Sequence, residues 1–218
     1  MKIVQILYLP FLSLIYLIIS LVPKKKKIWI FGGWFGKKYS DNSKYLFEYI
    51  SVNHKDIRTI WITHKKQIRE LIRKKGFEAY LSYEIKGIFY SIRANSAIIC
   101  QTKQDIGAIL LGGKKVVQLW HAIPLKKIMY DHEYDNKIYT NFFRVVKKYL
   151  FPFQYEKYNM SIASSIEVQS RMMSAYKLKR SQVKITGYPR NDIILADSKC
   201  NPYPLIFSTQ SMSLSENN

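Results

Sequence analysis

Short apolar runs alternate with helical patterns along most of this chain, and this alternation restricts the possible folds more than any other feature. Each run is short, rich in β-branched and aromatic residues, and bounded by polar residues or glycine, which predicts a buried strand. The predicted strands cover Ile28–Phe31, Thr59–Thr63, Ser96–Cys100, Lys115–Trp120, Ser161–Ser164 and Val183–Thr186. Strands that alternate with helices build βαβ units with parallel strands. The sequence therefore predicts an α/β fold, a Rossmann-like doubly wound parallel sheet.

The segments between these runs carry helix signals. Ser40, Asp41 or Asn42 can cap a helix that follows the first strand. Gly76 is a stop signal for the next helix. The predicted helices follow Ser40, cover Lys65–Lys75 and Ser82–Ala94, and lie near Ile166–Tyr176.

The amino terminus is a long uncharged segment followed by four lysines. Ile3 to Val22 contains 20 residues without a charge, and Lys24 to Lys27 follow it after Pro23. A helix of that length spans roughly 30 Å, the thickness of a hydrocarbon core. We predict an uncleaved membrane-anchoring helix over residues 1–23, with the domain on the cytoplasmic face and the lysines at an anionic membrane surface. The alternatives are a buried core helix and a helix lying in the membrane interface.

The net charge of +20 favours anionic partners such as phospholipid headgroups, nucleotide phosphates and polyanions. Nucleic acid is a further class of anionic partner, but it is the least favoured one, because no recognition motif accompanies the charge. The two cysteines, Cys100 and Cys200, are far apart and outside any CxxC pair, so neither a disulfide framework nor a zinc site is predicted.

Two segments depart from the α/β pattern. Asn141–Tyr158 mixes aromatic residues with cations, which indicates either a basic amphipathic element on a membrane or an ordinary surface helix. Asn201–Asn218 is rich in Ser, Asn and Pro and carries one charge, Glu216. We interpret this end as a disordered tail or as sequence foreign to the fold.

Three loops with chemically useful residues each follow a predicted strand directly. Gly32–Gly33 allow close backbone approach, Trp120–His121 supply a histidine, and Arg190 in the segment ITGYPRND supplies a fork for a phosphate. The carboxyl ends of parallel strands meet at one edge of the sheet, where we expect these loops to converge. His121 is a candidate general base; the structural alternatives are a histidine satisfied in a turn, a simple glycine turn and a structured loop.

The segments FGGWFGKKYSDNSKYLFEY, LWHAIPLKK and TGYPRND together resemble the CDP-glycerol glycerophosphotransferases, over roughly Lys27 to Asp192. The family builds poly(glycerol phosphate) and poly(ribitol phosphate) chains of teichoic acids and related capsule polymers. The resemblance implies a GT-B architecture, in which an N-terminal Rossmann-like domain is associated with the acceptor and a C-terminal one holds most of the CDP-alcohol site. His121 matches the histidine proposed as catalytic base, and Ala122 stands where the family commonly has glycine.

The resemblance implies partners and site residues. The partners are CDP-glycerol or a similar CDP-alcohol as donor and a lipid-linked polymer as acceptor, and neither a cofactor nor a metal is implied. The catalytic residue that the resemblance implies is His121. The substrate-binding candidates, among which the two lysines can also form a solvated basic rim, are Gly32, Gly33, Asp41, Asn42, Trp120, Pro124, Lys126, Lys127, Arg190 and Asp192.

The expected organisation is a membrane anchor at 1–23, an acceptor-side domain at 24–199 and an atypical polar tail at 200–218. The family continues past TGYPRND into a donor domain, so we interpret this chain as a truncated or frameshifted N-terminal half. Two other functions stay open: another GT-B glycosyltransferase of surface polysaccharide synthesis, and a non-catalytic membrane-anchored fragment that binds polyanions.

Overall fold

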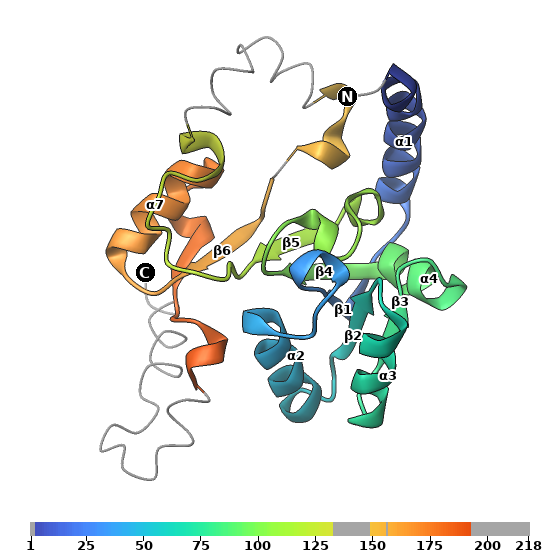
Figure 1. Cartoon of the computed structure of the whole chain (residues 1–218), viewed down its shortest axis with the longest axis horizontal. Helices are drawn as coiled ribbons and strands as arrows, with labels where there is room; N and C mark the ends of the chain where they lie inside the picture. Colours follow the sequence, from blue (N-terminus) through green and yellow to red (C-terminus); the bar gives the residue numbers. More distant parts are fainter. Residues whose placement is uncertain (1–2, 133–148, 156, 193–218) are drawn as a thin grey trace.

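The computed structural model describes residues 3–132, 149–155 and 157–192 (Figure 1). The predicted polar tail at 200–218 and half of the basic segment Asn141–Tyr158, namely residues 141–148 and 156, lie outside these residues. Seven parallel strands form one sheet in the order β3-β2-β1-β4-β5-β6-β7, which confirms the predicted α/β class. The strands are β1 Lys25–Phe31, β2 Arg58–Thr63, β3 Ala79–Leu81, β4 Ala94–Ile99, β5 Lys115–Gln118, β6 Met160–Ala163 and β7 Val183–Ile185.

The α-helices that lie wholly within the described part of the chain are α1 Ile3–Leu21, α2 Asp41–Asn53, α3 Lys66–Lys74, α4 Ile85–Arg93 and α7 Ile166–Tyr176. Short 3₁₀ turns occupy several loops, namely η1 Trp34–Gly36, η2 Lys103–Asp105, η3 Ala108–Leu111, η4 Met129–Asp131, η5 Pro152–Gln154 and η6 Arg180–Gln182. The start of α7 has a capping side chain, because the Ser165 hydroxyl accepts a hydrogen bond from the N–H of Val168 at 3.2 Å.

The core lies on both faces of the sheet. Ile30 of β1 is in register with Ile60 of β2 and Ala97 of β4, and all three side chains are fully buried in one cluster. The next residue of each strand points to the opposite face, so Phe31 and Trp61 enter a second cluster with Phe47 of α2. Burial on both faces explains why these strands are continuous apolar runs rather than alternating ones.

The observed strands differ from the predicted ones in an additional strand, β3, and in several strand ends, of which that of β5 bears on the site. β3 was not predicted, because a strand of three residues is too short to show a periodicity. β5 ends at Gln118, before the predicted end at Trp120. Trp120 has a φ of 57°, a left-handed conformation that a strand residue does not adopt.

The predicted N-terminal membrane anchor is wrong. None of the helices in the described part of the chain combines the length and the apolar character that crossing a membrane requires, so attachment to the cell membrane through residues 1–23 is not supported. Helix α1 instead packs on the domain: the Ser13 hydroxyl donates to the carbonyl of Leu150 at 2.5 Å, and a Cβ at Gly112 would lie 2.5 Å from the carbonyl oxygen of Tyr16.

The lysines after α1 also have a structural role that was not predicted. The ammonium of Lys24 donates to the carbonyls of Ile19, at 2.6 Å, and Ile92, at 3.0 Å, which ties the end of α1 to the end of α4. Lys25, the next residue, is already part of β1. The basic run therefore joins α1 to the sheet.

Candidate active site

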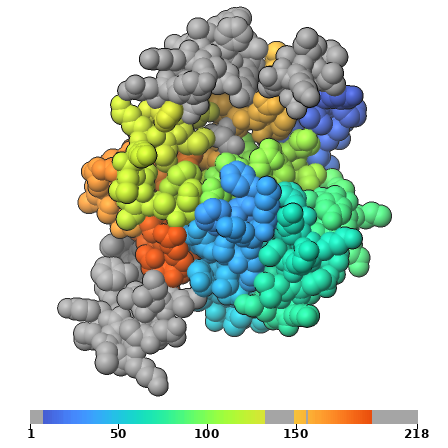
Figure 2. Space-filling model, in the orientation of Figure 1, coloured from blue at the N-terminus to red at the C-terminus, as the bar shows by residue number. Residues whose placement is uncertain are grey.

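The candidate site lies at the carboxyl edge of the sheet. The strand order reverses at β1, which has β2 on one side and β4 on the other. Ligands of open α/β sheets bind outside the carboxyl ends of the strands at such a reversal. In Figure 2 the blue segment of η1 and α2 adjoins the yellow-green segment that follows β5 and the red-orange segment that follows β7. Three loops that are far apart in the sequence therefore meet here.

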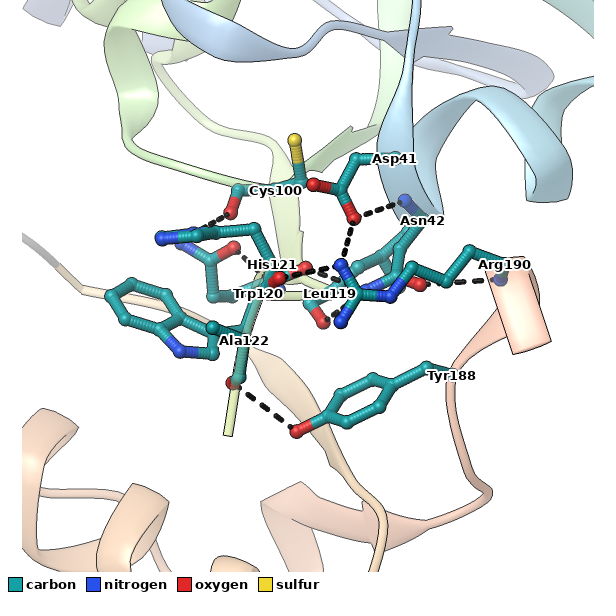
Figure 3. Close-up of polar contacts among 10 residues, drawn as sticks. Asp41, Asn42, Cys100, Leu119, Trp120, His121, Ala122, Tyr188 and Arg190 are labelled. Atoms are coloured by element: carbon teal, nitrogen blue, oxygen red, sulfur yellow. Dashed lines mark hydrogen bonds and ion pairs between the residues drawn. The ribbon is translucent and has the colours of Figure 1, made fainter. Parts of the chain in front are cut away.

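His121 is held by one ring nitrogen. Its Nδ1 lies 3.1 Å from the carbonyl oxygen of Cys100, at the end of β4 (Figure 3). A carbonyl oxygen only accepts hydrogen bonds, so Nδ1 carries the proton and Nε2 of the neutral ring is the acceptor. His121 is half-buried. The ring is thus in the tautomer that a general base acting through Nε2 requires.

Two tryptophan rings contact the His121 imidazole. The ring centroid of Trp120 lies 4.4 Å from that of His121, and the centroid of Trp34 lies 5.8 Å away. Both tryptophans have a left-handed backbone conformation, with φ of 57° for Trp120 and 50° for Trp34. Such conformations cost about 1–3 kcal/mol each and persist where the surrounding contacts impose them. For Trp120 one such contact is a hydrogen bond from its N–H to the Gln118 side chain at 3.0 Å.

Asn42, in the first turn of α2, ties the loops after β5 and β7 together. It is fully buried. Its amide nitrogen donates to the carbonyls of Trp120, at 2.7 Å, and Leu119, at 3.4 Å. Its amide oxygen accepts the backbone N–H of Arg190 at 3.2 Å. Asn42 therefore fixes the backbone that precedes the histidine and links it to the loop that follows β7.

Arg190 and Asp41 form an ion pair beside His121 (Figure 3). The Arg190 Nη1 lies 3.0 Å from Asp41 Oδ1 and also donates to the carbonyl of His121 at 2.7 Å. The Asp41 side chain is only 8% exposed, so its charge needs this partner. The guanidinium predicted to bind a phosphate thus also holds the loop that carries His121.

The structure brings five of the predicted site residues into one cluster: Asp41, Asn42, Trp120, His121 and Arg190. Pro124 lies further along the same loop, where its carbonyl accepts a hydrogen bond from Arg171 at 2.7 Å. Lys126, Lys127 and Asp192 are exposed, and their substrate-binding roles stay predictions.

The two predicted glycines lie at a crossing of two chain segments. A Cβ at Gly32 would be 2.5 Å from the carbonyl oxygen of Asp105, and one at Gly33 would be 3.3 Å from the Cys100 sulfur. The space that Gly32 leaves is thus filled by protein backbone. Ala122, which stands where the family commonly has glycine, does not have a positive φ, so this backbone does not require glycine there.

Asp105 was missed by the sequence analysis. Its fully buried carboxylate accepts three backbone N–H groups, from Phe35 at 2.7 Å, Cys100 at 3.0 Å and Gln101 at 2.8 Å. Burial raises the pKa of Asp105, and the N–H groups around it oppose that rise. The sequence contains one signal for this turn, because Thr102 is a residue type that caps helical turns and it does cap the turn that contains Asp105. A polar loop with a single acidic residue does not, however, predict a role for that residue.

Metal binding has no support from the described residues, which contain no cluster of three or more His, Cys, Asp or Glu side chains able to hold an ion. Cys100 is a free buried thiol, and burial raises its pKa to about 12. It is therefore protonated at neutral pH and unsuited to act as a nucleophile.

The similar curated proteins are enzymes of teichoic acid synthesis. The chain is 27% identical over 199 residues to the teichoic acid poly(glycerol phosphate) polymerase of Bacillus subtilis, covering 89% of this chain and 25% of that protein. It is 28% identical over 177 residues to the teichoic acid glycerol-phosphate transferase of Staphylococcus aureus, covering 80% of this chain and 43% of that protein. The chain thus spans less than half the length of these relatives.

The solved structures show the same fold. A structure of the wall teichoic acid polymerase TagF, a histidine variant soaked with CDPG, matches with a TM-score of 0.64 at 21% identity, over 87% of this chain and 45% of that one. The family model described as CDP-Glycerol:Poly(glycerophosphate) glycerophosphotransferase matches residues 14–203. Because this match covers most of the sequence, the chain belongs to the CDP-glycerol:poly(glycerophosphate) glycerophosphotransferase family.

Proposed function

We propose that the described domain is the acceptor-side half of a GT-B glycerophosphotransferase that extends a membrane-linked polymer of teichoic acid type. Its family membership and the names of its relatives support this activity. CDP-glycerol is the proposed donor, which the CDPG soak of the structural relative supports. The proposed acceptor is a lipid-linked polymer that ends in a free hydroxyl.

The geometry of His121 carries the proposal. The carbonyl of Cys100 holds the proton on Nδ1, so Nε2 offers its lone pair. Asn42 and Arg190 fix the backbone around the histidine. A base must be held within hydrogen-bond reach of the proton it removes, and this loop is fixed before any substrate binds.

In the proposed reaction, Nε2 of His121 takes the proton of the acceptor hydroxyl. The hydroxyl oxygen attacks the β-phosphorus of CDP-glycerol, which carries the glycerol. The bond from this phosphorus to the CMP oxygen breaks, and CMP leaves with the electron pair. Arg190 offsets the charge of Asp41, which would otherwise repel the phosphates. Lys126 and Lys127 are proposed to face the pyrophosphate, where cations stabilise the developing charge.

The test is CMP release by the purified full chain, supplied with CDP-glycerol and a lipid-linked glycerol phosphate primer. We expect His121→Ala to lower the rate by about 100-fold or more, because general bases contribute about 10²–10⁴-fold. His54→Ala is the matched control, since His54 is exposed at the end of α2, outside the cluster. Release that survives His121→Ala would reject the base assignment, and a wild-type chain that neither binds the primer nor releases CMP would contradict the proposed acceptor-side role.

A further inference from the structure

One peptide unit connects Asp105 to His121. The peptide between Cys100 and Gln101 has its C=O on the Cys100 side and its N–H on the Gln101 side. The C=O accepts Nδ1–H of His121 at 3.1 Å, and the N–H donates to Oδ2 of Asp105 at 2.8 Å. The carboxylate, the peptide and the imidazole therefore form a continuous chain of hydrogen bonds.

This arrangement resembles a carboxylate–histidine pair with a peptide group inserted between the partners. In a direct pair the carboxylate fixes the tautomer and the orientation of the imidazole. Hydrogen bonds in a chain polarise one another, which strengthens each bond by about 10–30%. A negative charge on Asp105 polarises the Gln101 N–H, which makes the Cys100 carbonyl a stronger acceptor for Nδ1–H.

Asp105 also fixes the turn that brings Trp34 to the imidazole. Its Oδ1 accepts the N–H of Phe35 at 2.7 Å, and Phe35 has a left-handed φ of 56°. The preceding residue, Trp34, contacts the imidazole ring of His121. The two oxygens of one buried carboxylate thus organise two different contacts of the same histidine.

We propose that Asp105 is a positioning residue for His121, which it holds in the Nδ1–H tautomer through the Cys100–Gln101 peptide. The catalytic meaning of this role rests on the proposed function, in which Nε2 of His121 is the base. The hydrogen-bond chain itself requires no turnover and is tested separately.

The main test compares His121 tautomers in the folded full chain by long-range ¹H–¹⁵N spectra of the imidazole nitrogens. Asp105→Asn keeps the size of the side chain but removes its negative charge. We expect the ratio of Nδ1–H to Nε2–H to fall about fivefold, which corresponds to weakening one hydrogen bond by about 1 kcal/mol. A folded Asp105→Asn protein whose ratio stays within about twofold of wild type would overturn the inference.

A control separates positioning from general stability. Gln169→Ala removes another buried hydrogen bond, from Gln169 Nε2 to the carbonyl of Val183 at 2.6 Å, between α7 and β7. We expect it to lower the Tm and to leave the His121 tautomer ratio unchanged. If Gln169→Ala changed the tautomer ratio as much as Asp105→Asn does, the inference would also be overturned, because the ratio would then depend on general stability and not on Asp105.

A second variant keeps Asp105 in place and serves if Asp105→Asn does not fold. His121→Phe keeps a ring and removes the donor to the Cys100 carbonyl. We expect the amide proton of Gln101 to move upfield by more than that of Cys100. Both amides donate to the same carboxylate oxygen, but the Cys100 N–H belongs to a different peptide unit. Equal shifts of the two amides would contradict the hydrogen-bond chain from Asp105 to His121.

The transferase assay keeps the two proposals apart. A tautomer change in Asp105→Asn combined with full activity of His121→Ala would refute the base and leave the positioning role standing. Loss of activity in His121→Ala combined with an unchanged tautomer ratio in Asp105→Asn would refute only the positioning role of Asp105.

Discussion

Replacing Asn42 with alanine tests whether this buried amide fixes the loop that carries His121. The substitution removes three hydrogen bonds: one of 2.7 Å to the Trp120 carbonyl, a weaker one of 3.4 Å to the Leu119 carbonyl, and one of 3.2 Å from the Arg190 N–H. At about 0.5–1.5 kcal/mol each, with two of them long, the free energy of unfolding should fall by about 2–3 kcal/mol. In a domain of this size that lowers the Tm by about 5–10 °C.

Asn53→Ala is the matched control, because Asn53 lies at the other end of α2 and its amide also donates to a backbone carbonyl, that of Tyr49 at 2.9 Å. This bond is exposed to water, so its loss should change stability by at most about 0.5 kcal/mol. Thermal unfolding of both variants, followed by circular dichroism, gives the comparison. An Asn42→Ala protein as stable as Asn53→Ala would refute the view that α2 fixes the site through this amide.

Three further variants test the packing of the fold. Burial, together with the neighbouring charge of Lys24, lowers the pKa of Lys114 to about 6. Between about pH 6 and 10.5 the unfolded chain therefore binds a proton that the folded chain lacks. The resulting loss of stability is complete below pH 6 and disappears as the pH rises to 10.5. Lys114→Met should therefore raise stability on the order of 3 kcal/mol at pH 7 and much less at pH 10, and an equal gain in chemical denaturation at both pH values would contradict the titration. Gly32→Ala should lower the free energy of unfolding by about 2 kcal/mol or more, because the new Cβ would lie 2.5 Å from a backbone oxygen; an unchanged Tm would contradict that close approach. Phe47 is fully buried, so Phe47→Ala should lower the free energy of unfolding in urea by about 3–5 kcal/mol. Phe89 is 51% exposed, so Phe89→Ala should lower it far less, and equal losses in the two variants would contradict the assignment of Phe47 to the core.

The sequence predicted the sheet because strands buried on both faces are continuous apolar runs. Ile28 to Phe31 illustrates this, since alternate residues enter opposite clusters and every one of them is apolar. The same reasoning failed for Ala79–Leu81, where three residues carry no usable period. It also failed for the amino terminus, because an uncharged helix that packs on a domain has the same composition as one that enters a membrane.

The site was predicted in part for a similar physical reason. Parallel strands end at a common edge, so the order of motifs along the chain was enough to bring His121 near Arg190 and Asp41. The sequence could not predict that Arg190 also holds the loop that carries the histidine.

The sequence alone determined the parallel α/β class, the edge at which the loops gather, the family and the identity of the candidate base. These follow from local periodicity and from motifs, which do not depend on long-range contacts. Only the tertiary structure decided that α1 packs on the domain, which nitrogen of His121 carries the proton, and that Asp105 reaches it through a peptide. Tautomers and relays depend on which backbone groups from distant strands come within hydrogen-bond distance, and those distances exist only once the chain has folded.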